Sequence, residues 1–171
     1  MAVATQVSVE EYLSTVYEPD CDYVDGELVE RNVGEYEHSR LQWALGQWFG
    51  SLESSRGVRV IPELRVQVAP TRFRVPDVCV TLGKPGERIL TRPPFLCIEV
   101  LSPEDRMSRM MERIADYLKF GVPNIWIIDP ATHKGYSATD RGLLEARDGF
   151  LRTASPDFAL SLEELFLAAE E

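Results

Sequence analysis

Residues 73–82, FRVPDVCVTL, and residues 94–103, PFLCIEVLSP, are the two stretches on which the fold is predicted to be built. Each is an apolar, β-branched run of strand length, and each contains one carboxylate, Asp77 or Glu99, where an aliphatic side chain is expected. An unpaired carboxylate in the interior of a sheet costs several kcal/mol of folding free energy. Two such residues in neighbouring strands therefore indicate a nearby cation.

The alternation of side chains predicts where these carboxylates point. Asp77 lies on the face opposite that of Val78, and Glu99 on the face opposite that of Ile98. One choice of strand register then places both carboxylates on the same face, where they can share a hard divalent ion through oxygen ligands. Taken singly, Asp77 in a turn after Pro76, or Glu99 paired with an arginine, is an equally acceptable structural carboxylate. Together the two favour a metal site. If each carboxylate were bound to its own arginine with no room for an ion, this interpretation would be contradicted.

Composition indicates one globular domain over residues 1–171. Of these 171 residues, 44% are hydrophobic, which suffices for a core. No apolar run is long enough to span a bilayer and residues 1–6 lack a signal-peptide pattern, so we expect a cytoplasmic protein without a membrane partner. The 3 cysteines are widely spaced and are expected as buried free thiols. A net charge of −10 weighs against broad nucleic-acid binding but not against a local basic cleft.

Local patterns predict the order of helices and strands. The expected elements are a helix over residues 8–16 with Ser8 as its cap, a hairpin over 21–30 that turns at Asp25-Gly26, a helix over 34–55, an interrupted strand over 58–68, strands within 73–82 and 94–103, a helix over 104–120, a strand over 124–130, a β meander over 136–153 and a final helix capped by Ser161. The strand at 124–130 follows a helix and is therefore expected to run parallel to the strand at 94–103.

The helix after Glu99 carries a row of arginines. At about 100° per residue, its apolar stripe is formed by Met107, Met110, Met111, Ile114 and Leu118. Arg106, Arg109 and Arg113 follow one border of this stripe. We expect Arg106 and Arg109 on a solvated face and Arg113 as a partner of the carboxylates. A fixed cation there would balance the acids and stabilise the charge that develops in phosphoryl transfer.

Several of these motifs, in this order, resemble one known family. They are the Asp-Gly hairpin, a helix that begins near His38, VPDV at residues 75–78, IEVLSP at residues 98–103 and WIIDP at residues 126–130. Over about residues 8–165 the chain resembles the Uma-two family, which belongs to the restriction-endonuclease-like PD-(D/E)XK nuclease superfamily. The resemblance implies an α/β (α+β) fold with a restriction-endonuclease-like core, a mixed β-sheet flanked by helices, to which the N-terminal β-hairpin and the C-terminal β meander are added.

The resemblance also implies a site and a substrate. Asp77, Glu99 and the carbonyl group of Val100 would bind Mg²⁺, with Mn²⁺ as a substitute, and DNA would be the substrate. The motif's lysine is missing from its usual place, which is Leu101 here, and the matching position on the following helix is Arg113. Because arginine does not give up its proton, Arg113 is expected to orient water or bind phosphate and not to act as a base.

The leading hypothesis is therefore a Mg²⁺-dependent endonuclease with Asp77, Glu99 and Arg113 as its catalytic residues. Glu37 or His38 is expected to reach the same cleft as an outer acidic or imidazole group, although a capping or surface role suits His38 equally well. The alternative is a nuclease-fold protein with weakened or no activity and a binding or regulatory role, which the missing lysine and the acidic surface favour. A third hypothesis is a metal-dependent hydrolase that acts on nucleotides or on a protein partner. Exposed strand edges would also suit a homodimer.

Overall fold

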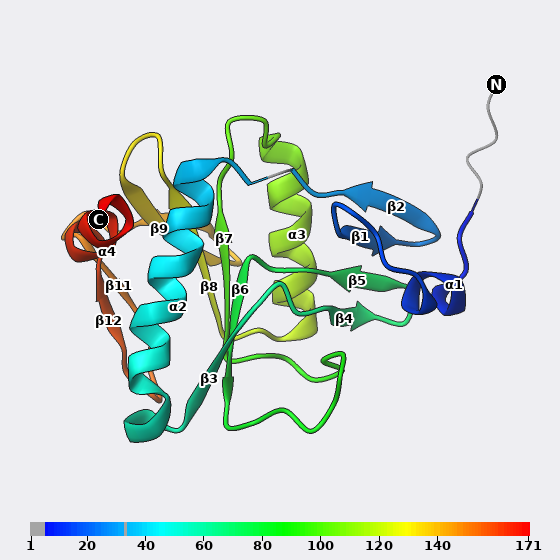
Figure 1. Cartoon of the computed structure of the whole chain (residues 1–171), viewed down its shortest axis with the longest axis horizontal. Coiled ribbons are helices and arrows are strands. Elements are labelled where there is room, and N and C mark those ends of the chain that lie inside the picture. The colour runs from blue at the N-terminus through cyan, green and yellow to red at the C-terminus, as the bar shows by residue number, and fades with distance from the viewer. Residues whose placement is uncertain (1–5, 33) are drawn as a thin grey trace.

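A six-stranded sheet in the order β10-β9-β8-β7-β6-β3 forms the centre of the fold. The computed structural model describes residues 6–32 and 34–171 (Figure 1). The strands of the central sheet are β3 (Val58–Pro62), β6 (Val78–Leu82), β7 (Leu96–Val100), β8 (Asn124–Asp129), β9 (Lys134–Thr139) and β10 (Gly142–Glu145). β7 and β8 run parallel, as predicted for strands joined by a helix, and the other neighbours are antiparallel. The predicted mixed sheet is therefore confirmed.

Helices cover both faces of this sheet, with α2 (Tyr36–Arg56) and α4 (Leu162–Glu170) on one face and α3 (Met107–Phe120) on the other (Figure 1). Alternate strand residues therefore enter two different cores. Val78 and Ile98 pack with α2 and α4, whereas Cys79 and Cys97 pack with α3. The side chain of Glu99, which follows Ile98, likewise contacts α3.

A second, four-stranded sheet in the order β2-β1-β5-β4 lies beside α3 (Figure 1). It contains β1 (Cys21–Val24), β2 (Glu27–Glu30), β4 (Val66–Ala69) and β5 (Arg72–Arg74), and the short helix α1 (Val9–Ser14) packs against it. Asp25 and Gly26 form the predicted hairpin turn with φ values of 50° and 99°. Tyr12 of α1 stacks on Tyr23 of β1 and contacts Phe73 of β5, so a small aromatic core holds α1 in place.

The chain changes sheet at two points where the sequence predicts a single strand. Residues 58–68 divide into β3 in the central sheet and β4 in the four-stranded sheet. Residues 73–82 likewise divide into β5 and β6, with Val75, Pro76 and Asp77 between them. Proline has no backbone N–H to donate to a ladder, which accounts for the second break. Asp77 consequently lies just before β6 and not within a strand.

The C-terminal strands depart from the predicted meander in one respect. β9 and β10 form the predicted hairpin, but β11 (Phe150–Arg152) pairs with β12 (Ala159–Ser161) in a two-stranded sheet of its own. Leu151 of β11 is buried in the core that contains α2 and α4. The third strand thus covers one face of the central sheet instead of extending its edge. Helix α4 then begins with the predicted serine cap, since the Oγ atom of Ser161 accepts a hydrogen bond from the backbone of Glu164.

Helix α3 begins at Met107, later than predicted, and it buries a different stripe. Met110, Ile114 and Tyr117 are buried, whereas Met107 and Met111 are 58% and 39% exposed. A tyrosine fits this interior position because its ring is apolar and its hydroxyl group finds a hydrogen-bond partner there.

Two further predictions concern the cysteines and membrane-spanning helices. The three cysteines, Cys21, Cys79 and Cys97, are buried and free, as predicted. Among the residues that the structure describes, there is no helix with the length and apolar character needed to cross a membrane.

Candidate functional site

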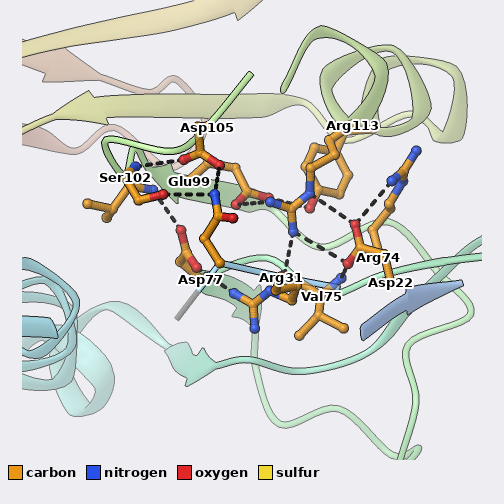
Figure 2. A network of polar contacts seen from close by, with 12 residues as sticks. Asp22, Arg31, Arg74, Val75, Asp77, Glu99, Ser102, Asp105 and Arg113 are labelled. Carbon is orange, nitrogen blue, oxygen red and sulfur yellow. Dashed lines mark hydrogen bonds and ion pairs between the residues drawn. The ribbon is translucent and has the colours of Figure 1, made fainter. Parts of the chain in front are cut away.

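Asp77 lies just before β6, next to the end of β7, the strand that contains Glu99. β6 and β7 pair from Val78, which lies opposite Ile98, so Asp77 precedes the first paired residue of β6. Asp77 and Glu99 are both buried, with 4% and 0% exposure. The Oδ2 atom of Asp77 accepts a hydrogen bond of 2.8 Å from the backbone N–H of Val100 (Figure 2). This bond fixes Asp77 against the end of β7.

Both oxygens of Asp77 also contact cationic side chains. Oδ1 accepts a hydrogen bond from Nη2 of Arg31 in a buried ion pair, and Oδ2 lies 3.2 Å from Nε2 of His38. Burial opposes ionisation of Asp77, but the hydrogen bond from His38 and the charge of Arg31 outweigh it and hold the pKa of Asp77 at about 2. Asp77 is therefore a carboxylate at neutral pH.

Glu99 is bound by two side chains of α3. Nη1 of Arg113 lies 3.0 Å from Oε2 of Glu99, and the hydroxyl group of Tyr117 donates a hydrogen bond of 2.6 Å to Oε1. Burial raises the pKa of Glu99 to about 8, with the charge of Arg113 opposing this rise and that of Asp77 adding to it. The pKa of Asp77 is thus lowered and the pKa of Glu99 is raised. Many catalytic acid pairs have pKa values that are separated in this way.

Arg113 also reaches two acceptors beyond Glu99. Its Nε atom lies 3.1 Å from Oδ2 of Asp22, and its Nη2 atom donates a hydrogen bond of 2.8 Å to the carbonyl oxygen of Val75 (Figure 2). Asp22 in turn accepts hydrogen bonds from Nη1 of Arg74 at 3.1 Å and from the backbone N–H of Val75 at 2.9 Å. Asp22 therefore positions the guanidinium group of Arg113 next to Glu99.

Comparison with known proteins places this chain in a family. A family model described as "Uma2: Putative restriction endonuclease" matches residues 9–163. The chain belongs to the Uma2 family. This is the Uma-two family that the sequence motifs resemble, and the match includes Asp77, Glu99 and Arg113.

The fold of this Uma2 chain is also found in solved structures. A crystal structure described as "a putative nuclease belonging to DUF820 from Anabaena variabilis ATCC 29413" is similar with a TM-score of 0.80 and 23% identity, over 95% of this chain and 99% of that chain. This likeness shows that the two chains share the restriction-endonuclease-like fold. A cryoEM structure of a DrdV–DNA complex is similar with a TM-score of 0.44 and 13% identity, over 81% of this chain and 12% of that chain. No curated protein matches the chain.

The structure separates the other residues that the sequence singles out. His38 of the Uma2 chain reaches Asp77, whereas Glu37 lines a neighbouring cavity of about 480 Å³ that His38 also borders. Within residues 6–32 and 34–171, no hydrogen bond or ion pair joins Glu37 to either carboxylate. Arg106 and Arg109 are exposed, as predicted.

Sequence reasoning missed Asp22, Arg31 and Tyr117. Asp22 lies in the buried strand β1, between two buried neighbours, and this unusual place for an acid is a signal that could have identified it. No comparable signal exists for Arg31, because it follows the last residue of β2 and its partner Asp77 is 46 positions away. Tyr117 lies at helical spacing from Arg113, and that spacing could have indicated a second partner for Glu99.

This Uma2 chain has the oxygen donors of a magnesium site, but arginine side chains already occupy the two carboxylates. Asp77 and Glu99 offer carboxylate oxygens, and Val100 offers a carbonyl oxygen. However, Asp77 already binds Arg31 and Glu99 already binds Arg113. No group of three or more His, Cys, Asp or Glu side chains within the described residues is arranged to hold an ion. An ion therefore fits between the carboxylates only after a guanidinium group moves.

Proposed function

We propose that this Uma2 protein is a metal-dependent endonuclease that hydrolyses phosphodiester bonds in DNA. The burial of two acids close together, Glu99 in β7 and Asp77 bound to the backbone of the next β7 residue, Val100, is the observation that supports the proposal. Aliphatic side chains at these positions would stabilise the fold at least as well, because buried carboxylates carry a desolvation penalty. Family membership supports hydrolysis of this class.

Mg²⁺, with Mn²⁺ as a substitute, is the proposed cofactor. Asp77, Glu99 and the carbonyl group of Val100 would hold it, since hard divalent ions prefer oxygen ligands. When bound, such an ion polarises the scissile phosphate and lowers the pKa of a bound water molecule.

Arg113 supplies the fixed positive charge of the proposed site. Burial opposes its charge, but Asp22 and Glu99 raise the pKa of Arg113 well above its ordinary value. Its contacts with Asp22 and with the carbonyl oxygen of Val75 hold the guanidinium group in place before substrate binds. Arg113 is thus suited to stabilise charge on phosphate oxygens, and it is unsuited to accept a proton from water.

His38 is the proposed proton-exchanging group beside Asp77. Its Nε2 atom faces Asp77, and its Nδ1 atom is buried without a hydrogen-bond partner among the described residues. It also borders the cavity that Glu37 lines. Imidazole exchanges protons near neutral pH, which suits this position.

A nuclease-fold protein with weak or no activity and a binding or regulatory role is the second candidate. Both carboxylates are already paired with arginine, and this observation favours it. The resemblance also implies a lysine where this chain has Arg113. A site that has lost its function would retain these ion pairs as structural links.

Cleavage of plasmid DNA in Mg²⁺, Mn²⁺ or EDTA separates the two candidates. We expect the wild type to cleave only with the metal, and Glu99→Ala to lose about a hundredfold or more in rate. Glu163→Ala, which removes an exposed acid of α4, serves as the matched control and should cleave as the wild type does. Cleavage by Glu99→Ala at the wild-type rate would contradict the first candidate. Arg113→Lys should lose activity in an adapted site, whereas a strong gain supports the second candidate.

We also propose that the protein forms a homodimer. β3 and β10 form the two edges of the central sheet, and neither has an outer partner strand within residues 6–32 and 34–171. Unpaired edges favour association. Light scattering during size-exclusion chromatography should give twice the mass of the chain, and the mass of a single chain at all concentrations would contradict the dimer.

A further inference from the structure

Arg31 occupies the oxygen of Asp77 that an ion would need. Oδ2 of Asp77 is used by the backbone N–H of Val100 at 2.8 Å and by His38 at 3.2 Å. A carboxylate oxygen has room for about two such partners, so Oδ1 is the oxygen with capacity left. Nη2 of Arg31 binds Oδ1, and the side chains of Arg31 and Asp77 are only 11% and 6% exposed. A divalent ion on Oδ1 would therefore meet a buried guanidinium group of like charge.

The residue after Arg31 anchors this segment across the site. Nδ2 of Asn32 donates hydrogen bonds of 2.9 Å to Oγ of Ser102 and of 2.6 Å to Oδ1 of Asp105 (Figure 2). Asp105 also accepts a hydrogen bond of 2.6 Å from the backbone N–H of Ser102. Ser102 and Asp105 follow β7, which ends beside Glu99. The segment that contains Arg31 is therefore tied to the loop after β7 through the side chain of Asn32.

Glu63 offers Arg31 a second acceptor close by. Nη1 of Arg31 lies 3.7 Å from Oε1 of Glu63, and the Glu63 side chain is 52% exposed. The backbone N–H of Glu63 donates a hydrogen bond of 3.3 Å to the carbonyl oxygen of Asp77. Nε2 of Gln42 bridges that carbonyl oxygen at 2.8 Å and Oε1 of Glu63 at 3.4 Å. Arg31 thus lies within ion-pair distance of a second, more exposed carboxylate while it is bound to Asp77.

We propose that Arg31 is a built-in competitor of the divalent ion, and that ion binding moves its guanidinium group from Asp77 to Glu63. The inference rests on the proposed function only in taking Asp77 as an ion ligand. It accounts for a buried carboxylate that is stable before any ion binds, because Arg31 compensates its charge. It also implies that the wild type binds the ion more weakly than an open carboxylate pair would.

Titration with Mn²⁺ tests the competition without DNA and without cleavage. Isothermal titration calorimetry gives the affinity, and the electron paramagnetic resonance signal of free Mn²⁺ gives a second readout. We expect Arg31→Gln to bind Mn²⁺ about tenfold more tightly or better, since a hydrogen bond to a charged group no longer has to break. We expect Glu63→Gln to bind more weakly, because the displaced guanidinium group loses its counter-charge. Arg152→Gln removes an exposed arginine paired with Asp148 and should leave the affinity unchanged.

The outcomes separate this inference from the proposed function. Equal or weaker Mn²⁺ binding by Arg31→Gln, beside a wild type that binds, overturns the competition and leaves the metal site intact. Absence of Mn²⁺ binding in both proteins overturns the competition together with the metal dependence. Circular dichroism shows whether each variant folds. If Arg31→Gln does not fold, Glu63→Gln decides, since weaker binding supports the competition and unchanged binding overturns it.

Discussion

Nη1 of Arg113 in α3 donates a hydrogen bond of 3.0 Å to Oε2 of Glu99 in β7, which is buried. The same guanidinium group binds Asp22 of the N-terminal hairpin and the carbonyl oxygen of Val75 between β5 and β6. A proposed catalytic charge is therefore also a link between three segments that lie far apart in the sequence. Substitutions at this position act on stability as well as on activity, and both need to be measured.

Arg113→Lys should lower the free energy of unfolding by about 2 kcal/mol. A planar guanidinium group serves Glu99, Asp22 and the Val75 carbonyl together, whereas an ammonium group cannot, and a buried acceptor left unpaired is costly. Urea denaturation in EDTA measures the change. Arg152→Lys, at an exposed ion pair, is the control and should behave as the wild type. Equal stability of Arg113→Lys and the wild type would show that the shared contacts do not stabilise the fold.

Asp22→Asn should lower the free energy of unfolding by about 3 kcal/mol, because Arg74 and Arg113 lose a buried counter-charge. Asparagine keeps an oxygen acceptor for the backbone N–H of Val75, so the change isolates the charge. The measurement is again urea denaturation, with Asp157→Asn as a control, since Asp157 pairs with an arginine at the surface. A small effect at Asp22, comparable with that of the control, would refute its role in holding the two arginines.

The pKa of His38 should lie above its ordinary value of 6.5 and fall in Asp77→Asn. Burial lowers the pKa of His38, but the hydrogen bond and the charge of Asp77 outweigh burial and raise it. Since the pKa is raised by folding, the stabilisation from this pair is complete below pH 6.5 and is lost as pH rises through the folded-state pKa.

Nuclear magnetic resonance titration of the imidazole protons measures this pKa. The sequence has 2 histidines, so His133 provides an internal reference in each spectrum. An unchanged pKa of His38 in Asp77→Asn would mean that the two side chains do not interact in solution.

Two glycine substitutions should change stability in opposite directions. A Cβ atom on Gly135 of β9 would lie 2.9 Å from Cδ2 of Leu162 and 3.0 Å from Cδ1 of Leu151, so Gly135→Ala should cost about 1–2 kcal/mol. A Cβ atom on Gly46 of α2 would meet nothing within 4 Å, so Gly46→Ala should stabilise by about 0.5–1 kcal/mol. Thermal unfolding measures both. A stabilising Gly135→Ala would contradict the packing of β11 and α4 over β9.

Short-range patterns account for what the sequence predicts well. Helix caps, the Asp-Gly turn and strand alternation act over a few residues, and helical spacing places Arg113 beside Glu99 as predicted. Such patterns do not show the contacts of Arg31 and Asp22, because their partners Asp77 and Arg113 lie 46 and 91 positions away. Periodicity shows which face a residue occupies but not which sheet its strand joins.

The breaks between β3 and β4 and between β5 and β6 transfer the chain to a second sheet that short-range patterns do not indicate. The strands of that sheet depend on long-range packing, since Val66 and Val68 of β4 pack with α3, whereas Phe73 of β5 packs with Tyr12 and Tyr23. The same holds for β11, whose pairing with β12 follows from burial of Leu151 against α2 and α4.

Anomalous diffraction from crystals soaked in Mn²⁺ decides whether the carboxylate pair binds a divalent ion. We predict an anomalous peak in contact with oxygens of both Asp77 and Glu99, with the carbonyl group of Val100 as a third donor and Arg31 displaced from Asp77. Density without an ion at the pair, with Arg31 and Arg113 still bound to their carboxylates, would contradict the metal-dependent nuclease.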